Sequence, residues 1–162
     1  TSKDRSTYIG CLYPGLKITP KGIMVLEFNA RFGAPECQSY MSLLKTDLFE
    51  TLMACAEGRL SEIKIECEQK YAVCVVLASG GYPDDFKVGY PIFGIKEAEQ
   101  VPEVEIFHAG TKYKNGYFVT AGGRVLNVTA TGETLQEARE RAYEAVSLIN
   151  FEGMHYRTDI AE

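Results

Sequence analysis

The alternation of apolar and polar residues predicts an antiparallel hairpin near the start of the chain. Residues 8–19, YIGCLYPGLKIT, are rich in Tyr, Leu and Ile and are interrupted only by Pro14-Gly15. A Pro/Gly turn signal follows at 20–22, and a second apolar run covers 23–29. Short apolar runs on both sides of such a turn are typical of paired strands. We therefore expect 8–19 and 23–29 to pair as a hairpin.

A helix is predicted next, over residues 42–57. Apolar residues recur there at helical spacing, and Gly58 stands where a helix commonly ends; they are Leu43, Leu44, Leu48, Leu52, Met53 and Ala56. Residues 59–70 form a polar connection that contains a short alternating strand. We place a domain boundary in this connection, which gives domains 1–62 and 63–162.

The remaining hundred residues predict a compact module of a sheet and a helix. Three strands, one hairpin with Asn115-Gly116 at its tip, and a C-terminal helix capped by Thr131 or Thr134 are expected; the strands cover 71–79, 104–110 and 124–130, and the hairpin covers 111–120. The inner helix face carries Leu135, Ala138, Ala142, Ala145, Val146 and Ile149. The predicted fold class is α+β.

Composition and charge exclude several classes of protein. The 162 residues are 46% hydrophobic and 24% charged, which is ordinary for a globular protein. The net charge of −5 argues against a nucleic-acid partner. No apolar run approaches the roughly 20 residues that span a bilayer, so no membrane association is expected. Five cysteines without a C-x-x-C pair indicate free thiols in a reducing, cytoplasmic setting.

The stretch VLEFNARFGAPE, residues 25–36, carries the strongest candidate chemistry. Glu27, Asn29 and Arg31 alternate, so on a strand they would project from one face, about 6–7 Å apart at roughly 3.3 Å per residue. Carboxylate and amide oxygens suit Mg²⁺, which takes few protein ligands together with phosphate oxygens. Arg31 could hold a phosphate or carboxylate through two parallel hydrogen bonds and stabilise charge on a transferring phosphoryl group.

A plainer interpretation of the same stretch is an edge strand whose polar face meets water. Phe28, Phe32 and Val25-Leu26 argue against it, because a strand with so much apolar area should be mostly buried. A carboxylate beside buried apolar groups then needs a partner or a metal. The pattern alone leaves both interpretations open.

Two weaker candidates lie in the second half of the chain. His108 could contact a substrate from a strand end, although a lone histidine is more often structural. Gly122-Gly123 would let the backbone approach a ligand closely while Arg124 offers a fork for a phosphate. A glycine pair at a hairpin end would have the same pattern without any ligand. We predict His108, Gly123 and Arg124 as substrate-binding residues.

Several motifs spread in order over the chain resemble one enzyme family. They are YPGLKIT, VLEFNARFGAPECQ, LLKTDLFE, VVLASGGYP, FHAGT, GGRVLNVTA and FEGMHYRTDI. From Gly10 to Ile160 the chain is similar to the C-terminal part of glycinamide ribonucleotide synthetase (phosphoribosylamine–glycine ligase), of the ATP-grasp superfamily. The resemblance implies the last strands and helix of an ATP-grasp domain followed by a small sheet-plus-helix domain.

The resemblance also implies an activity and a metal site. The family joins glycine to 5-phosphoribosylamine in purine biosynthesis, hydrolyses ATP and forms a glycyl phosphate. Its Glu and Asn in LEFN are metal ligands, which would make Glu27 and Asn29 the ligands of Mg²⁺, or Mn²⁺, beneath the ATP phosphates. Arg31 would then be the catalytic cation. The implied small-molecule partners are ATP, glycine and phosphoribosylamine.

The chain departs from the family pattern at three points. Ala34 stands where the family usually has Asp in RFGDPE, and Asp84 stands where Gly is common. The family's adenine-binding and phosphate-covering segments lie upstream and are not in this chain, so the missing N-terminal part of the same enzyme is an implied partner. Another carboxylate–amine ligase of the superfamily, or a non-catalytic binding or assembly module, remains an alternative.

Overall fold

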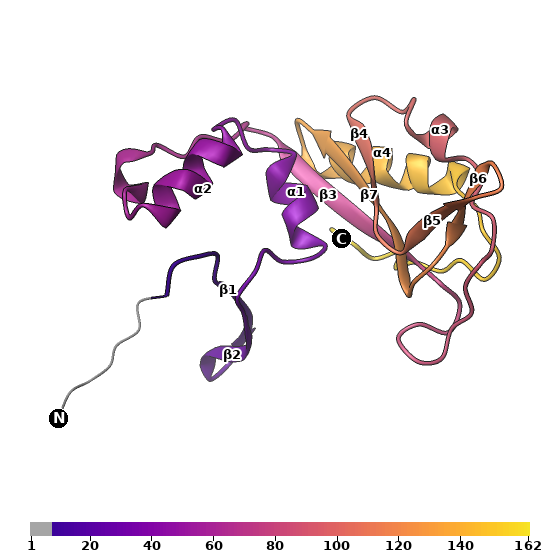
Figure 1. The fold of residues 1–162 in the computed structure, drawn as a ribbon, viewed down its shortest axis with the longest axis horizontal. Coiled ribbons are helices and arrows are strands. Elements are labelled where there is room, and N and C mark those ends of the chain that lie inside the picture. Colours follow the sequence, from indigo (N-terminus) through magenta and orange to yellow (C-terminus); the bar gives the residue numbers. More distant parts are fainter. Residues whose placement is uncertain (1–7) are drawn as a thin grey trace. The chain divides into compact units, whose positions relative to one another are not determined.

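The computed structural model describes residues 8–162, which divide into two compact units (Figure 1). The first unit contains residues 8–34 and 44–67, and the second contains residues 35–43 and 68–162. The chain therefore enters the second unit briefly before it returns to the first. The predicted boundary at 62/63 stays a prediction about the family's domains.

The predicted hairpin at the start of the first unit is confirmed. Strands β1 (Tyr13–Thr19) and β2 (Gly22–Asn29) pair antiparallel, with Tyr13 opposite Asn29 and Thr19 opposite Gly22. The register shifts between Gly15 and Leu16. This irregularity follows Pro14, which has no N–H to give to the ladder.

The helix predicted over 42–57 is shorter than expected. Helix α2 runs from Leu48 to Ala56 and begins where the Asp47 side chain accepts a hydrogen bond from the Glu50 N–H at 2.8 Å. A carboxylate at this position satisfies an N–H that the first helical turn leaves unpaired, which fixes the helix start. Leu43 and Leu44 precede it, and Leu44 bridges Cys67 instead.

Two further differences from the prediction surround α2. A separate helix, α1 (Glu36–Met41), precedes it and was not predicted. The strand expected within 59–70 is replaced by a 3₁₀ turn, η1 (Leu60–Glu62), and the single bridge at Cys67. Alternation over so few residues, without a neighbouring strand to pair with, does not produce a ladder.

The second unit is the sheet-plus-helix module that the sequence predicts. Its central sheet is antiparallel in the order β3-β7-β4, a separate hairpin pairs β5 with β6, and two helices complete the unit. The bounds are β3 Tyr71–Ala78, α3 Ile95–Ala98, β4 Val104–His108, β5 Thr111–Lys114, β6 Tyr117–Thr120, β7 Arg124–Gly132 and α4 Leu135–Leu148. The α+β prediction is confirmed.

One face of the central sheet packs against α4 and forms the core. The small inner residues Ala138, Ala142 and Ala145 are fully buried, so the helix lies close to the sheet. They contact alternate apolar side chains of β3 and β7, which include Val75 and Leu126. Burying each such side chain stabilises the fold by about 1.5–3 kcal/mol.

The other face of the sheet is more polar and lies near α1. It carries the alternate residues of the same strands, with Cys74 of β3 opposite Thr129 of β7 and Val76 opposite Asn127. Helix α1 contacts both strands. Burial raises the pKa of the Cys74 thiol, Thr129 partly opposes that increase, and the charge of Glu36 on α1 adds a smaller increase. The sheet thus has an apolar face and a polar face.

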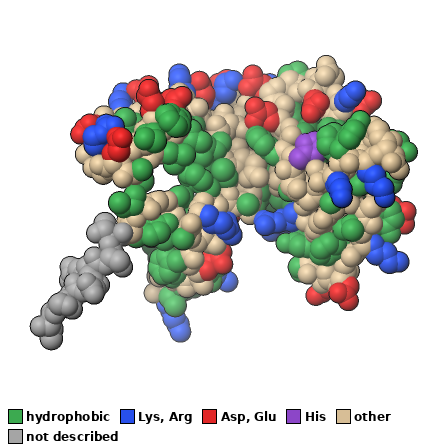
Figure 2. Space-filling model, in the orientation of Figure 1, with side chains coloured by type: hydrophobic (Ala, Val, Ile, Leu, Met, Phe, Trp, Pro, Cys, Tyr) green, Lys and Arg blue, Asp and Glu red, His purple; other side chains and the backbone are tan. Residues whose placement is uncertain are grey.

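The hairpin of the first unit exposes much apolar surface, visible as green over the lower part of that unit in Figure 2. Phe28 is 67% exposed and Ile18 is 86% exposed. The sequence led us to expect a mostly buried strand. Among residues 8–162, β2 pairs only with β1, and a two-stranded sheet has too few neighbours to cover its side chains.

Candidate metal and phosphate site

Glu27 and Asn29 lie side by side near the end of β2, as their alternation predicts. The Asn29 Nδ2 amide donates to Glu27 Oε1 at 2.9 Å and lies 3.5 Å from the Tyr13 carbonyl oxygen on the neighbouring strand. The amide thus orients the carboxylate. It leaves the second carboxylate oxygen and the amide oxygen as the natural ligands for a cation.

Gly15 makes room for the Glu27 side chain. It lies opposite Glu27 in the β1–β2 register. A Cβ atom at Gly15 would come within 3.0 Å of Glu27 Cγ and 3.7 Å of Glu27 Oε1. The missing side chain therefore allows the carboxylate to lie across the neighbouring strand. In the sequence alone, Gly15 stands out only as part of the Pro14-Gly15 interruption.

Arg31 is not on the same strand as the other two. Strand β2 ends at Asn29, and the Arg31 Nη1 donates to the Phe32 carbonyl oxygen at 2.9 Å. The expected alternation therefore holds for Glu27 and Asn29 but stops before the guanidinium. Arg31 lies in the exposed turn after the strand, close in sequence to the pair.

The oxygen pair has the composition of a site for a hard cation. Within residues 8–162, no three His, Cys, Asp or Glu side chains gather closely enough to hold a metal ion. One carboxylate and one amide oxygen are too few for an all-protein cage. They suit Mg²⁺, which keeps several waters and uses one or two protein ligands together with substrate phosphates. The residues present therefore fit the metal that the resemblance implies.

Gly122, Gly123 and Arg124 lie together at the start of β7. Ser79 donates from its N–H to the Gly123 carbonyl and from its Oγ to the Gly122 carbonyl, both at 2.8 Å. A Cβ atom at Gly123 would overlap the ring of Tyr82. Packing of Tyr82 is thus one reason for a glycine here. Substrate binding by Gly123 and Arg124 remains a prediction.

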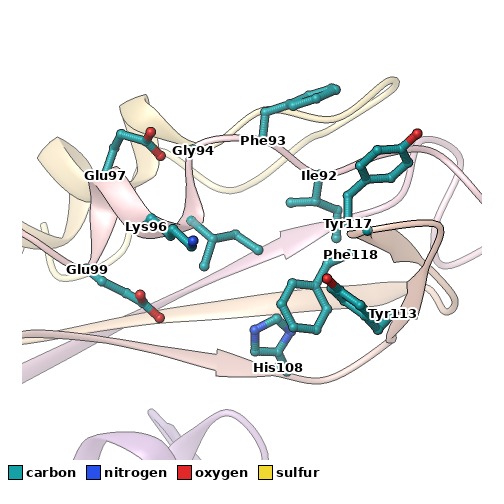
Figure 3. A pocket seen from close by; sticks show the side chains of 12 residues that line it. Ile92, Phe93, Gly94, Lys96, Glu97, Glu99, His108, Tyr113, Tyr117 and Phe118 are labelled. Carbon is teal, nitrogen blue, oxygen red and sulfur yellow. The ribbon is translucent and has the colours of Figure 1, made fainter.

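His108 lines a different cavity, between α3 and the β5–β6 hairpin (Figure 3). Its Nδ1 lies 2.8 Å from Thr111 Oγ1, and its ring centroid lies 4.3 Å from that of Phe118. The cavity has a volume of about 480 Å³, and neither Gly123 nor Arg124 lines it. The three predicted substrate residues therefore do not share one pocket in this structure.

The aromatic wall of this cavity was missed by the sequence analysis. Tyr113 and Phe118 are opposite each other in the hairpin register, and their ring centroids are 5.2 Å apart. The hairpin signal at Asn115-Gly116 would have predicted this pairing.

Residues 8–162 contain no helix that is both long and apolar enough to cross a bilayer.

Comparison with protein families places the fold in a known class. The model for the ATP-grasp (A) domain of phosphoribosylglycinamide synthetase matches residues 1–37, and the model for the C domain of the same family matches residues 72–162. The first match contains Glu27 and Asn29, so the oxygen pair belongs to an ATP-grasp segment. The chain belongs to the phosphoribosylglycinamide synthetase family.

Named relatives agree with this assignment. The chain is 50% identical over 98% of its length to phosphoribosylamine–glycine ligase of Caldanaerobacter subterraneus, of which it spans 37%. It is 46% identical over 98% of its length to the human trifunctional purine biosynthetic protein adenosine-3, of which it spans 16%. The crystal structure of phosphoribosylamine–glycine ligase from Thermotoga maritima matches 91% of the chain at 38% identity with a TM-score of 0.75, and 36% of that protein is covered.

Proposed function

We propose that this chain is part of an ATP-dependent ligase that joins glycine to 5-phosphoribosylamine in purine biosynthesis. The observation that carries the proposal is the Glu27–Asn29 oxygen pair, held by a 2.9 Å hydrogen bond within the segment that matches the family's ATP-grasp domain. The chain spans little more than a third of its single-function relatives. The remaining nucleotide-binding groups would come from an N-terminal part of the same enzyme.

In this proposal each predicted residue has a separate role. Glu27 and Asn29 hold Mg²⁺, or Mn²⁺, and the metal supplies charge stabilisation at the ATP phosphates. Arg31 provides a cation for the phosphoryl group as it moves to the glycine carboxylate. The phosphoribosylamine nitrogen then attacks the glycyl phosphate and releases phosphate.

His108, Gly123 and Arg124 are proposed to contact the phosphoribosylamine substrate. Arg124 is the strongest of the three, because a guanidinium can bind a phosphate through two parallel hydrogen bonds. The five free cysteines of the described chain accord with a reducing, cytoplasmic location. Neither nucleic acid nor a membrane has a place in the proposal.

The decisive experiment uses the longer protein that contains this segment. We expect ATP-dependent formation of glycinamide ribonucleotide from glycine and phosphoribosylamine, and we expect no product when Mg²⁺ is removed. A panel of other amino acids serves as the control. Faster reaction with an amino acid other than glycine would favour a different carboxylate–amine ligase. If no amino acid supports the release of phosphate from ATP, the result would favour a non-catalytic module.

A further inference from the structure

A polar pocket of about 310 Å³ lies on the second unit, apart from the residues of the proposed ligase site. Its lining residues are Ser42, Glu103, Val104, Glu105, Thr129 and Thr131. Five of the six present side-chain oxygens, as two carboxylates and three hydroxyls. The pocket lies toward the Gly132 end of β7, whereas Arg124 lies at the opposite end of that strand. Its chemistry therefore needs its own explanation.

Strand pairing brings these oxygens together. Glu105 of β4 lies opposite Thr129 of β7, and the Thr131 N–H donates to the Glu103 carbonyl at 3.0 Å. Because alternate residues of a strand share a face, the two glutamates and the two threonines project from the same side of the sheet. Ser42, which follows α1, adds an Oγ that lies 3.3 Å from Glu105 Oε2.

Thr129 supplies an independent indication of a ligand. The residue is 1% exposed, and its Oγ1 makes no hydrogen bond of regular geometry, although it lies close enough to the Cys74 thiol to lower the pKa of that group. Its cross-strand neighbour on the other side is Cys74, whose thiol is a weak hydrogen-bonding group. Buried hydroxyl groups normally have a partner. A group bound in the pocket would provide one.

The charge of the pocket selects the kind of ligand. Lys70 Nζ lies 3.1 Å from Glu103 Oε2, and Thr131 Oγ1 donates to the same oxygen at 2.7 Å. Glu103 therefore already has a cation and a hydroxyl donor on one carboxylate oxygen. Within residues 8–162, Glu105 forms no ion pair with a basic side chain. The pocket already attracts one cation and keeps a second carboxylate available.

We propose that this pocket binds a divalent metal cation through Glu105, Thr129 and Ser42, with Glu103 shared between the metal and Lys70. A donor set made only of oxygens, with two carboxylates, suits a hard cation. The volume leaves room for coordinated water, since one water occupies about 30 Å³. The residues of this pocket all belong to the second unit, whereas Glu27 and Asn29 belong to the first.

Manganese is a suitable probe, because its unpaired electrons broaden the NMR signals of nearby amides. The experiment titrates Mn²⁺ into the ¹⁵N-labelled 162-residue chain carrying Glu27→Gln, which removes the proposed catalytic metal site. We expect selective broadening around Glu105 and Thr129 at concentrations on the order of 0.1–1 mM, the range of weak oxygen-ligand sites. Broadening spread evenly over acidic surface residues, or none near Glu105, would overturn the proposal.

Substitutions test the ligands individually. Glu105→Gln and Thr129→Val should each weaken Mn²⁺ binding, and for Glu105→Gln we expect a loss of affinity on the order of tenfold. The control is Glu97→Gln, which removes an exposed carboxylate outside the pocket and should leave Mn²⁺ affinity unchanged. Spectra recorded without metal show whether each variant keeps its fold. If Thr129→Val does not fold, Glu105→Gln can test the proposal by itself, because Glu105 is exposed. Equal affinity of Glu105→Gln and Glu97→Gln would contradict the assignment.

Lys70→Met separates a metal site from a purely structural ion-pair network. Removing a tethered ammonium that competes for Glu103 should tighten Mn²⁺ binding several-fold. Unchanged or weaker binding would overturn a site that includes Glu103. None of these outcomes bears on the ligase proposal. The varied residues Glu105, Thr129, Lys70 and Glu97 lie outside its proposed site, the Glu27→Gln background is the same in every binding sample, and the activity assay uses the longer protein.

Discussion

Glu27 and Asn29 form a pair in which the amide orients the carboxylate before any cation binds. The 2.9 Å hydrogen bond restricts the Glu27 side chain, and Gly15 provides the space in which it lies. Restricting a ligand in advance reduces the entropy that is lost when the metal binds. At the scale of the residue, the geometry of the site depends on the missing side chain of Gly15 as well as on Glu27 and Asn29.

The first prediction compares the proposed metal ligand with the proposed cation. In the longer protein, Glu27→Gln should lower kcat/KM by about 100-fold or more, because the metal stabilises the transition state by several kcal/mol. Arg31→Lys keeps its charge and loses only the fork geometry, so we expect a loss of about tenfold or less. Steady-state kinetics over a range of Mg²⁺ concentrations measures both. Wild-type activity of Glu27→Gln at low Mg²⁺ would exclude Glu27 as a ligand.

The second prediction concerns Ala34, which stands where the family resemblance implies Asp. Ala34 is exposed in the turn after β2, so Ala34→Asp should change stability by about 0.5 kcal/mol or less. A charge-assisted hydrogen bond to the glycine ammonium is worth roughly 1.5–3 kcal/mol, or about ten- to a hundred-fold in affinity. We expect a lower KM for glycine and an almost unchanged Tm in the longer protein. An unchanged KM would show that this protein binds glycine without the carboxylate.

At the scale of the element, turns and caps explain both the successes and the errors of the sequence analysis. The Asn115-Gly116 tip has positive φ at both residues, 51° and 93°, as a tight hairpin turn requires. The error at 42–57 arose because apolar spacing continued across Asp47. Its side chain begins a new helix there, which the spacing alone could not reveal.

The third prediction tests the N-terminal cap of α4. Thr134 accepts a hydrogen bond from the Glu137 N–H at 3.1 Å. Thr134→Ala should therefore destabilise the second unit by about 1 kcal/mol. Gln136→Ala, on the exposed side of the same helical turn, is the matched control and should change stability by about 0.5 kcal/mol or less. Urea unfolding of the 162-residue chain checks both, and equal effects would remove the special role of the cap.

The fourth prediction separates packing from ligand binding at Gly123. Because a Cβ atom would overlap the Tyr82 ring, Gly123→Ala should destabilise the chain by about 1–3 kcal/mol without any ligand present. In a Tyr82→Ala background the same substitution should cost much less. A double-mutant cycle by denaturant unfolding measures the difference. If Gly123→Ala leaves stability intact, packing against Tyr82 does not explain the glycine.

At the scale of the whole molecule, the two units of the chain differ in how far their apolar side chains are buried. The second unit has a contiguous core formed by β3, β7 and α4. The first unit leaves large apolar side chains of its hairpin exposed, as Phe28 illustrates. A surface of this kind typically marks an interaction site, which accords with the proposal that further parts of the enzyme cover it.

The fifth prediction follows from the share of the relatives that the chain spans. We expect the 162-residue chain alone to have no measurable ligase activity, because phosphoryl transfer depends on positioning of the nucleotide by groups proposed to lie elsewhere. The assay supplies ATP, glycine and phosphoribosylamine and measures product. The longer protein is the positive control. Turnover by the short chain at an ordinary enzymatic rate would contradict the proposed division of the site.

The sequence by itself determined the hairpins, the strands of the second unit, the final helix and the family. These features depend on local periodicity, on turn residues such as Asn115-Gly116, and on motifs that stand in order along the chain. The adjacency of Glu27 and Asn29 was also predictable, because alternation along one strand fixes it. Such features need no knowledge of distant contacts.

Only the tertiary structure decided which residues from different elements meet. It placed His108 beside Phe118 in one cavity, apart from Gly123, which packs against Tyr82. It also brought Glu105 opposite Thr129, through a strand pairing between segments far apart in sequence. Register between such strands is set by the packing of the whole sheet, so no local pattern could have specified these neighbours.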